Sequence, residues 1–254
     1  MITLPTQKSK PQFSMSNLSM LLYGAPKIGK STFCSRAEDA LFVATEPGLN
    51  HLETYNVRVN SWREFLEVMA LIAKGNHPFK TIVIDTVDKL CDFCEQELCT
   101  QNNVVSLSDF AFGKGYALYK TEMSRVFQKI FALNMGVILT SHTQLTDVDT
   151  PQGRITRWTP TFPKRIQDVI IPMVDIIGFA QNVVSLNEKG ERVEERVLQT
   201  KTSSLWEAGD RTGRLPETIP FKYAIFEREL MKSVDAKKSA KKAQPAQPKV
   251  DSAE

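Results

Sequence analysis

The sequence predicts an α/β protein with a mostly parallel β-sheet, helices on both faces of that sheet and a β-rich C-terminal elaboration. Two observations carry this prediction. Short apolar runs alternate with segments of helical periodicity in the first half of the chain, and one of these runs leads directly into a glycine-containing phosphate-loop pattern. The 254 residues are 42% hydrophobic and 24% charged, which is enough apolar mass for a sizeable core. Collagen-like, mucin-like and wholly disordered classes are therefore excluded.

Strand-length apolar runs and helical patterns follow one another along the chain. The runs predicted as strands are residues 20–23, 41–44, 81–84, 136–139, 175–180 and 196–199. The predicted helices are residues 30–37, 62–74, 87–100 and 116–133. After Leu139 the pattern changes to loops and β-rich segments, and residues 143–168 carry few apolar pairs. The early alternation of strands and helices is what builds a parallel sheet covered on both faces.

The two ends of the chain differ in composition from its centre. Residues 1–16 are rich in Pro, Ser, Lys and Gln, and residues 232–254 are rich in Lys, Ala and Pro, so we expect both segments to be disordered. Residues 17–231 are expected to form the folded domain. The net charge of +3 lies in the C-terminal segment, which has six Lys and three acidic residues. Because the rest is net neutral, any nucleic-acid binding must come from a local patch or from this tail.

Membrane insertion and disulfide formation are not expected from the sequence. No stretch approaches the roughly 18 uninterrupted apolar residues of a membrane span, and the N-terminus lacks an apolar signal-peptide centre. We therefore expect a cytoplasmic protein without membrane partners, in the host cytoplasm if a phage encodes it. Cys91, Cys94 and Cys99 lack a nearby fourth ligand for structural zinc, so we expect them to be reduced and to pack as small apolar side chains.

Residues 24–31, Gly-Ala-Pro-Lys-Ile-Gly-Lys-Ser, match the phosphate-loop pattern of nucleotide-binding proteins. The glycines let backbone N–H groups converge on phosphates, Lys30 reaches the β- and γ-phosphates, and Ser31 coordinates magnesium. The pattern therefore predicts ATP and Mg²⁺ as cofactors, with Lys30 also contributing to catalysis. The predicted nucleotide-binding residues are Gly24, Ala25, Pro26, Lys27, Ile28, Gly29, Lys30, Ser31 and Thr32.

Two acidic residues follow other predicted strands. Asp85 ends the run 81–84, at the place where a Walker-B aspartate holds the magnesium ion through water; the alternative is an acid that caps the next helix. The next residue is Thr86 rather than Glu, so a base that activates water must come from another strand. Glu46 is the candidate, because parallel strands bring their carboxyl ends to one edge of the sheet. Its alternative role is that of a turn residue before a Pro-Gly pair.

Polar residues also follow the predicted strand at 136–139. At this edge of the sheet, His142 and, as second choice, Gln144 are placed to sense the γ-phosphate and to report its presence to the following loop. The alternative is a strand end that simply faces solvent.

These motifs together resemble the RecA-like branch of phosphate-loop ATPases. The resemblance is carried by the phosphate loop, Glu46, Asp85 without an adjacent Glu, and the polar residues 140–142. More closely, residues 23–32, 113–116 and 206–213 look like the bacteriophage nucleotide-binding proteins of that branch, over about residues 18–226. This resemblance implies a RecA-like P-loop core used in phage DNA recombination by strand annealing or exchange, often alongside a single-stranded-DNA-binding protein. It also implies a DNA-binding loop after the sensor strand.

The segment at 151–167 contains four basic residues and no acid, interleaved with aromatic residues. Basic side chains neutralise phosphates and aromatic rings stack on unpaired bases, so this composition predicts contact with single-stranded DNA. The alternative is a solvated hairpin whose Trp158 packs on the body of the protein. The predicted DNA-binding residues are Arg154, Arg157, Trp158, Lys164 and Arg165.

RecA-like ATPases complete their sites with a basic residue from the neighbouring copy. Lys201 or Arg211 is the candidate here, which implies a homo-oligomer or filament; each is otherwise a surface charge. The leading hypothesis is a DNA-stimulated ATPase that binds single-stranded DNA in phage recombination. One alternative is a motor ATPase of the replicative helicase or helicase-loader type. Another is a nucleotide-switched protein-interaction module that does not bind DNA.

Overall fold

The computed structural model describes residues 4, 6–7, 14–151, 153–186 and 190–232. The large sheet consists of β1 (Ser19–Gly24), β2 (Ala40–Ala44), β3 (Tyr55–Arg58), β4 (Thr81–Asp85), β5 (Gly136–Ser141), β8 (Ile176–Leu186), β9 (Arg192–Gln199), β10 (Gly209–Asp210) and β11 (Thr218–Pro220). A separate hairpin consists of β6 (Thr143–Thr150) and β7 (Gly153–Pro160). The helices are α1 (Lys30–Cys34), α2 (Trp62–Ala73), α3 (Val87–Gln101), α4 (Lys114–Phe131), α5 (Lys164–Ile170) and α6 (Tyr223–Met231), with short 3-10 turns at Met15–Asn17, Leu107–Asp109 and Ala111–Gly113.

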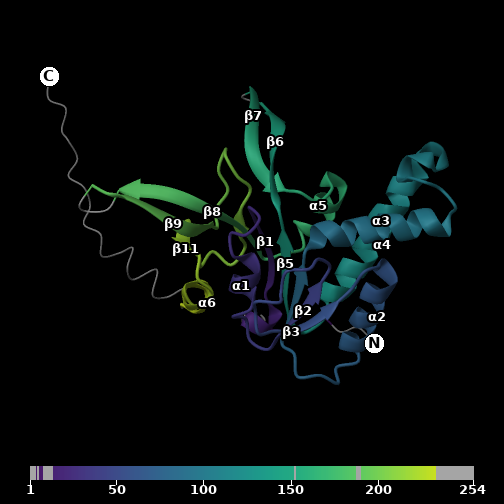
Figure 1. Cartoon of the computed structure of the whole chain (residues 1–254), viewed down its shortest axis with the longest axis horizontal. Helices are drawn as coiled ribbons and strands as arrows, with labels where there is room; N and C mark the ends of the chain where they lie inside the picture. The colour runs from purple at the N-terminus through teal and green to yellow at the C-terminus, as the bar shows by residue number, and fades with distance from the viewer. Residues whose placement is uncertain (1–3, 5, 8–13, 152, 187–189, 233–254) are drawn as a thin grey trace.

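Within the described residues, nine strands form the large sheet in the order β11-β9-β8-β1-β5-β4-β2-β3, and β10 pairs with β8 (Figure 1). All pairs from β3 to β8 are parallel, whereas β9, β10 and β11 add antiparallel pairs at the other side. The predicted fold class is therefore confirmed: a mostly parallel sheet carries helices on both faces and a β-rich C-terminal elaboration. The β6–β7 hairpin projects away from the sheet beyond the end of β5 (Figure 1).

Alternation along the buried strands gives the sheet two apolar faces. Leu21, Ile82 and Leu139 belong to a core cluster that also contains buried residues of α2, α3, α4 and α5. Met20 and Phe42 point the other way, into a second cluster that includes residues of α1 and α6. Because neighbouring residues of a strand face opposite sides, one strand such as β1 supplies both clusters. Burial on both faces holds the strands in place, so the position of their carboxyl ends is fixed by the core.

The six strands and four helices predicted from the sequence are present, with ends that shift by a few residues and a larger extension of β8. The sequence did not predict β3, β10, β11, α5 or α6 as individual elements. The strand β3 was not predicted because it is short and mostly exposed, so it lacks an apolar run. The segment at 143–160, which was expected to be loop and β-rich, forms the β6–β7 hairpin.

Most of the two segments that we predicted to be disordered, 1–16 and 232–254, lies outside the described residues. Regular structure begins at the turn Met15–Asn17, at the boundary of the first segment. No helix in the described part of the chain has the length and apolar character to cross a membrane. The core cluster also contains three cysteines of α3, Cys91, Cys94 and Cys99, next to residues of α2 and α4. Their burial is as expected for apolar packing, and it raises the pKa of the Cys91 thiol.

The Gly-Lys-Gly-Tyr motif at 113–116 has a structural role at the start of α4. Gly113 precedes the helix with φ +70°, in the left-handed region that glycine adopts without strain. Gly115 packs directly against the preceding turn, where an added Cβ would overlap the Leu107 carbonyl oxygen and lie 2.6 Å from the Phe110 ring. The motif therefore closes the connection between α3 and α4.

Substituting Gly115→Ala is expected to lower the free energy of unfolding by about 1–3 kcal/mol, because the new methyl group has no space. Urea denaturation measures the change. Gly209→Ala is the matched control, since the nearest heavy atom to its added Cβ is 3.8 Å away. Equal stability losses in the two variants would contradict the packing explanation.

Candidate functional site

The loop at 24–31 connects β1 with α1 and has a tightly constrained backbone. Lys27 and Gly29 have φ values of +64° and +107°, so the chain turns through the left-handed region at two places. Gly24 ends β1 against β8, and a Cβ at this position would lie 2.5 Å from the Ala180 carbonyl oxygen. The loop is thereby fixed at the carboxyl edge of the parallel strands, as the motif predicted.

Lys30 is buried at the base of this loop. Its ammonium group donates hydrogen bonds to the carbonyl oxygens of Gly24, at 2.9 Å, and Ala25, at 3.1 Å. Burial lowers the pKa of Lys30, and the nearby carboxylate of Asp85 opposes this shift. The positive charge is therefore held inside the loop, where a phosphate group would find it.

The carboxylate of Asp85 joins the loop to the strand beside it. Ser31 Oγ donates to Asp85 Oδ2 at 2.7 Å, and Thr140 Oγ1 donates to Asp85 Oδ1 at 2.5 Å. Since β5 lies between β1 and β4, Thr140 stands between the loop strand and the acidic strand. A hydroxyl and a carboxylate side by side are hard oxygen ligands of the kind that Mg²⁺ prefers. Ser31 and Asp85 thus fit the metal role predicted for them.

Glu46 and His142 meet at the same edge of the sheet. Glu46 Oε1 accepts a hydrogen bond from Thr86 Oγ1 at 2.9 Å, and Glu46 Oε2 lies 3.7 Å from His142 Nε2. Thr86 also caps α3 through a hydrogen bond from the Lys89 amide. Because β2, β4 and β5 are parallel, their carboxyl ends bring these side chains together as the sequence argument expected.

A cavity of about 520 Å³ lies over these groups. Its lining includes Lys27, Gly29, Lys30, Ser31, Thr32, Glu46, Asp85, Thr86 and His142. Gln144 is not part of it: this side chain is exposed on β6 and donates to the Pro160 carbonyl oxygen at 3.3 Å. Of the two predicted sensor residues, the structure brings only His142 to the cavity.

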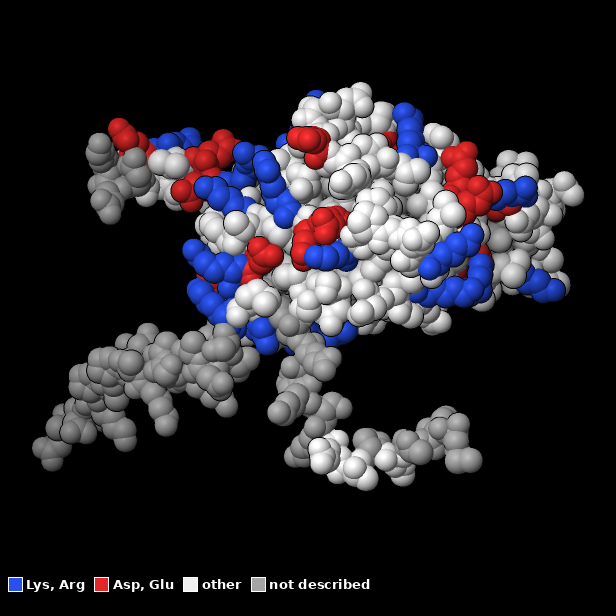
Figure 2. Space-filling view, turned by 90° about the horizontal axis from the view of Figure 1, so that it is seen from below, with Lys and Arg blue, Asp and Glu red and all other residues white. Residues whose placement is uncertain are grey.

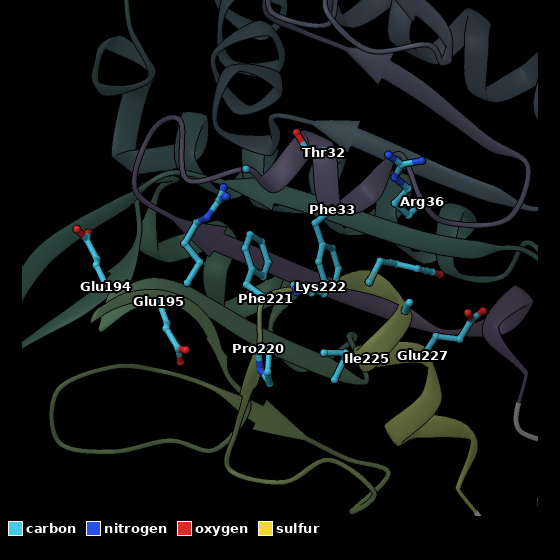
Figure 3. A pocket seen from close by; sticks show the side chains of 14 residues that line it. Thr32, Phe33, Arg36, Glu194, Glu195, Pro220, Phe221, Lys222, Ile225 and Glu227 are labelled. Atoms are coloured by element: carbon cyan, nitrogen blue, oxygen red, sulfur yellow. The ribbon is translucent and has the colours of Figure 1, made fainter. Parts of the chain in front are cut away.

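A second cavity, of about 790 Å³, adjoins the first on the side of α1 and α6 (Figure 3). Both cavities are lined by Gly29 and Thr32. The rings of Phe33 and Phe221 stack in its wall with centroids 4.8 Å apart, and Arg196 donates to the Ile28 carbonyl oxygen at 3.1 Å. Arg36, Lys222 and several glutamates border the opening (Figure 3). Sequence reasoning missed this cavity because β9 and α6 contribute to it from far along the chain.

Asp88, in the first turn of α3, is a site residue that the sequence did not single out. Its carboxylate accepts hydrogen bonds from Ser141 Oγ at 2.7 Å, from the His142 amide at 3.0 Å and from Thr161 Oγ1 at 2.5 Å. His142 comes directly before β6 and Thr161 directly after β7, so both lie at the base of the β6–β7 hairpin. The Asp88 carboxylate therefore holds both chain ends of this hairpin beside the cavity. An acid in a first helical turn is usually a helix-stabilising residue, so no sequence signal marked it.

Each residue of the predicted DNA patch has a partner within the chain. Acids from β6, from the segment before β10 and from α5 neutralise three of the basic side chains, and aromatic rings take the other contacts. The contacts are Arg154–Asp147 at 2.8 Å, Arg157–Glu207 at 3.0 Å, Lys164–Asp168 at 3.0 Å, Arg165 at 4.3 Å from the centroid of the Tyr116 ring, and Trp158 stacked on Phe179. The patch is therefore less positive in space than in sequence.

Lys201 and Arg211 lie away from the phosphate loop. Lys201 Nζ is 3.4 Å from Asp210 Oδ2, and Arg211 NH1 is 3.1 Å from Asp175 Oδ1. Both acids stand near the amino end of β8, whereas the loop follows the carboxyl end of the neighbouring strand β1. Seen from below, the surface shows basic and acidic groups interspersed (Figure 2). The structure does not bring either residue to the cavity of its own chain.

The chain is similar to a curated protein and to two solved structures. The chain is similar to the SPbeta prophage-derived uncharacterized protein YorG of Bacillus subtilis strain 168, with 25% identity over 191 residues that make up 73% of this chain and 54% of the relative. It thus spans about half the length of this curated relative. Among solved structures, it is similar to a KaiC-like protein from Pyrococcus horikoshii OT3, with a TM-score of 0.41, 13% identity and coverage of 72% of this chain and 77% of the other. The flagellar accessory protein FlaH from Methanocaldococcus jannaschii is similar with a TM-score of 0.42, 12% identity and the same two coverages.

The match to a family extends over most of the described chain. Residues 16–212 match the AAA domain family, and this range includes the phosphate loop, Glu46, Asp85 and His142. The chain therefore belongs to the AAA domain family.

Proposed function

We propose that the chain is a Mg²⁺-dependent ATPase that binds single-stranded DNA in phage recombination, by strand annealing or exchange. The observation that carries the proposal is the convergence of Lys30, Ser31, Asp85 and Glu46 on one cavity beside the fastened end of the β6–β7 hairpin. The AAA domain match supports the nucleotide chemistry. The prophage origin in the name of the Bacillus relative supports the phage context.

The two adjoining cavities divide the nucleotide between them. The phosphates lie in the smaller cavity, where the loop and Lys30 supply donors and positive charge. The adenosine part lies in the larger cavity, whose wall contains the stacked rings of Phe33 and Phe221. Gly29 and Thr32, which line both, stand where the two parts of the nucleotide join.

Ser31 and Asp85 would hold the magnesium ion, since their oxygens already lie 2.7 Å apart. When bound, such an ion neutralises the charge of the β- and γ-phosphates. Glu46 orients the attacking water, because its carboxylate lines the same cavity and Thr86 fixes its other oxygen. His142 lies beside Glu46, so it responds to what occupies the γ-phosphate position.

The β6–β7 hairpin is the part of the chain that contacts single-stranded DNA. Asp88 joins both ends of the hairpin to α3 next to the γ-phosphate side of the cavity, which supports DNA-stimulated hydrolysis. A single-stranded-DNA-binding protein is the expected partner. The chain acts as a homo-oligomer or filament, in which Lys201 or Arg211 reaches the cavity of a neighbouring copy, since neither reaches its own.

A second candidate function is a nucleotide-switched interaction module whose hairpin binds a protein. The pairing of Arg154 with Asp147 and of Arg157 with Glu207 favours it, because a neutralised hairpin attracts a phosphate backbone less.

Lys30→Ala tests the proposed function as a whole. The variant is expected to lose ATP turnover by at least about 100-fold and to lose ATP-dependent binding of oligonucleotides, because the buried ammonium group at the base of the loop is removed. Turnover is measured by phosphate release and binding by fluorescence anisotropy, with and without MgCl₂. Lys74→Ala, at an exposed helix end, is the control. Turnover without any DNA response in the wild type would favour the interaction module.

Glu46→Gln tests the catalytic assignment separately. The amide keeps the size of the side chain but cannot orient or deprotonate water in the same way, so turnover should fall by about 100-fold or more while ATP affinity stays within about threefold. Calorimetry measures the affinity, and Glu53→Gln, an exposed carboxylate outside the cavity, is the control. Full hydrolysis by Glu46→Gln would remove Glu46 from the mechanism.

A further inference from the structure

A third cavity, of about 330 Å³, borders the phosphate loop on the side of the β6–β7 hairpin. Trp158, Phe179, Gln181, Asn182 and Lys27 contribute to its lining. Lys27 and its neighbour Pro26 also line the phosphate cavity, so the loop separates the two spaces. A volume of this size lies at the lower end of the range of small-ligand sites. Neither the nucleotide phosphates nor the adenosine proposed above would occupy it.

One wall of this third cavity is aromatic and rigidly held. The Trp158 ring stacks on Phe179 with centroids 6.4 Å apart and planes at 25°, and Phe179 stacks in turn on Tyr23 at 4.9 Å. The backbone of Trp158 is fixed on both sides, since its amide donates to the Leu205 carbonyl oxygen at 2.8 Å and its carbonyl oxygen accepts from Tyr23 Oη at 3.2 Å. The half-buried Trp158 ring is therefore preorganised before any ligand arrives.

Three polar side chains of the lining, those of Lys27, Gln181 and Asn182, have no partner in the described part of the chain. Among the described residues, the side-chain amides of Gln181 and Asn182 make no hydrogen bond to the protein, and the Lys27 ammonium has neither an ion pair nor a hydrogen bond. Lys27 is exposed and adopts φ +64°, an unusual backbone conformation for a residue with a long side chain. Gln181 lies on the same face of β8 as Phe179, whereas Asn182, which is paired with Arg196 of β9, lies on the other face. A free amide and a free cation beside an aromatic wall are groups that a nucleobase and its phosphate engage.

We propose that this cavity binds one unpaired nucleobase of a single strand. The base stacks on Trp158, its edge meets the amide of Gln181, and the adjoining phosphate lies at Lys27. The proposal rests on the proposed binding of single-stranded DNA and moves the central contact from the charged hairpin surface to its base. Such a site lets a hairpin whose basic side chains are paired with acids still bind single-stranded DNA, because stacking does not need a net positive patch.

The test uses the full chain with Gln181→Ala, called the amide variant. The probe is a fluorescein-labelled oligo(dT) of about 20 nucleotides, which exceeds the footprint of one binding fold. With Mg²⁺ and ATP at fixed salt, the Kd of this variant is expected to rise about tenfold, since the Gln181 amide both donates and accepts a hydrogen bond with the base edge. Asn56→Ala, which removes an exposed amide from the far edge strand β3, is the matched control and should bind like the wild type.

Trp158→Leu gives a second measurement, with an expected loss of about 5- to 100-fold in oligonucleotide affinity. Because this change also disturbs the packing of Phe179, thermal unfolding is recorded for every variant and the amide variant is the primary test. ADP affinity, measured by calorimetry, separates a nucleobase in a strand from the base of the nucleotide itself.

The outcomes separate the two proposals. A larger loss of oligonucleotide affinity than of ADP affinity in the amide variant supports the strand site. If the wild type binds oligo(dT) and the amide variant binds equally well, the cavity assignment is wrong and single-strand binding stands. A loss confined to ADP assigns the cavity to the nucleotide's own base, and equal losses indicate damage to the phosphate loop; both overturn the strand site. Absence of oligonucleotide binding by the wild type in every nucleotide state removes both proposals.

Discussion

The hydrogen bonds to the carboxylate of Asp85 are the interactions on which the rest of the site depends. The carboxylate accepts hydrogen bonds from Ser31 at the start of α1 and from Thr140 at the end of β5, so it ties the phosphate loop to two neighbouring strands. Its charge also opposes the cost of burying Lys30. With β4 buried on both faces, this carboxylate has little freedom to move, and the loop takes its position from the sheet.

Much of the site was predictable because parallel strands impose a common edge. The spacing of the loop identified Lys30 and Ser31, and the rule that strand ends meet was enough to place Asp85, Glu46 and His142 around one cavity. Gln144 failed the same reasoning because β6 leaves the sheet after His142 and turns the next residues outward. Three positions beyond the end of β5, the edge rule no longer applies.

The charge of the segment at 151–167 was misjudged for a different physical reason. Counting along the chain finds four bases and no acid, but an antiparallel hairpin places β7 beside β6, where Asp147 pairs with Arg154. Glu207 reaches Arg157 from a segment 50 residues later in the chain, so no local window contains the pair. The cavity of about 790 Å³ was missed likewise, since Arg196 and Phe221 approach the loop from the antiparallel elaboration. Local periodicity predicts elements well and cross-strand partners poorly.

The phosphate loop forms a wall of all three cavities, and this gives the proposals a common physical basis. Gly29 lines the cavities of about 520 and 790 Å³, whereas Lys27 lines the cavities of about 520 and 330 Å³. The loop between them is short and turns twice through the left-handed region, so it does not adjust one side independently of the other. Any ligand that shifts Lys27 therefore changes the free energy of binding at Gly29, and the reverse change has the same size because binding linkage is reciprocal. With the two proposed sites, this shared loop would couple a bound DNA strand to the nucleotide without a separate signalling element.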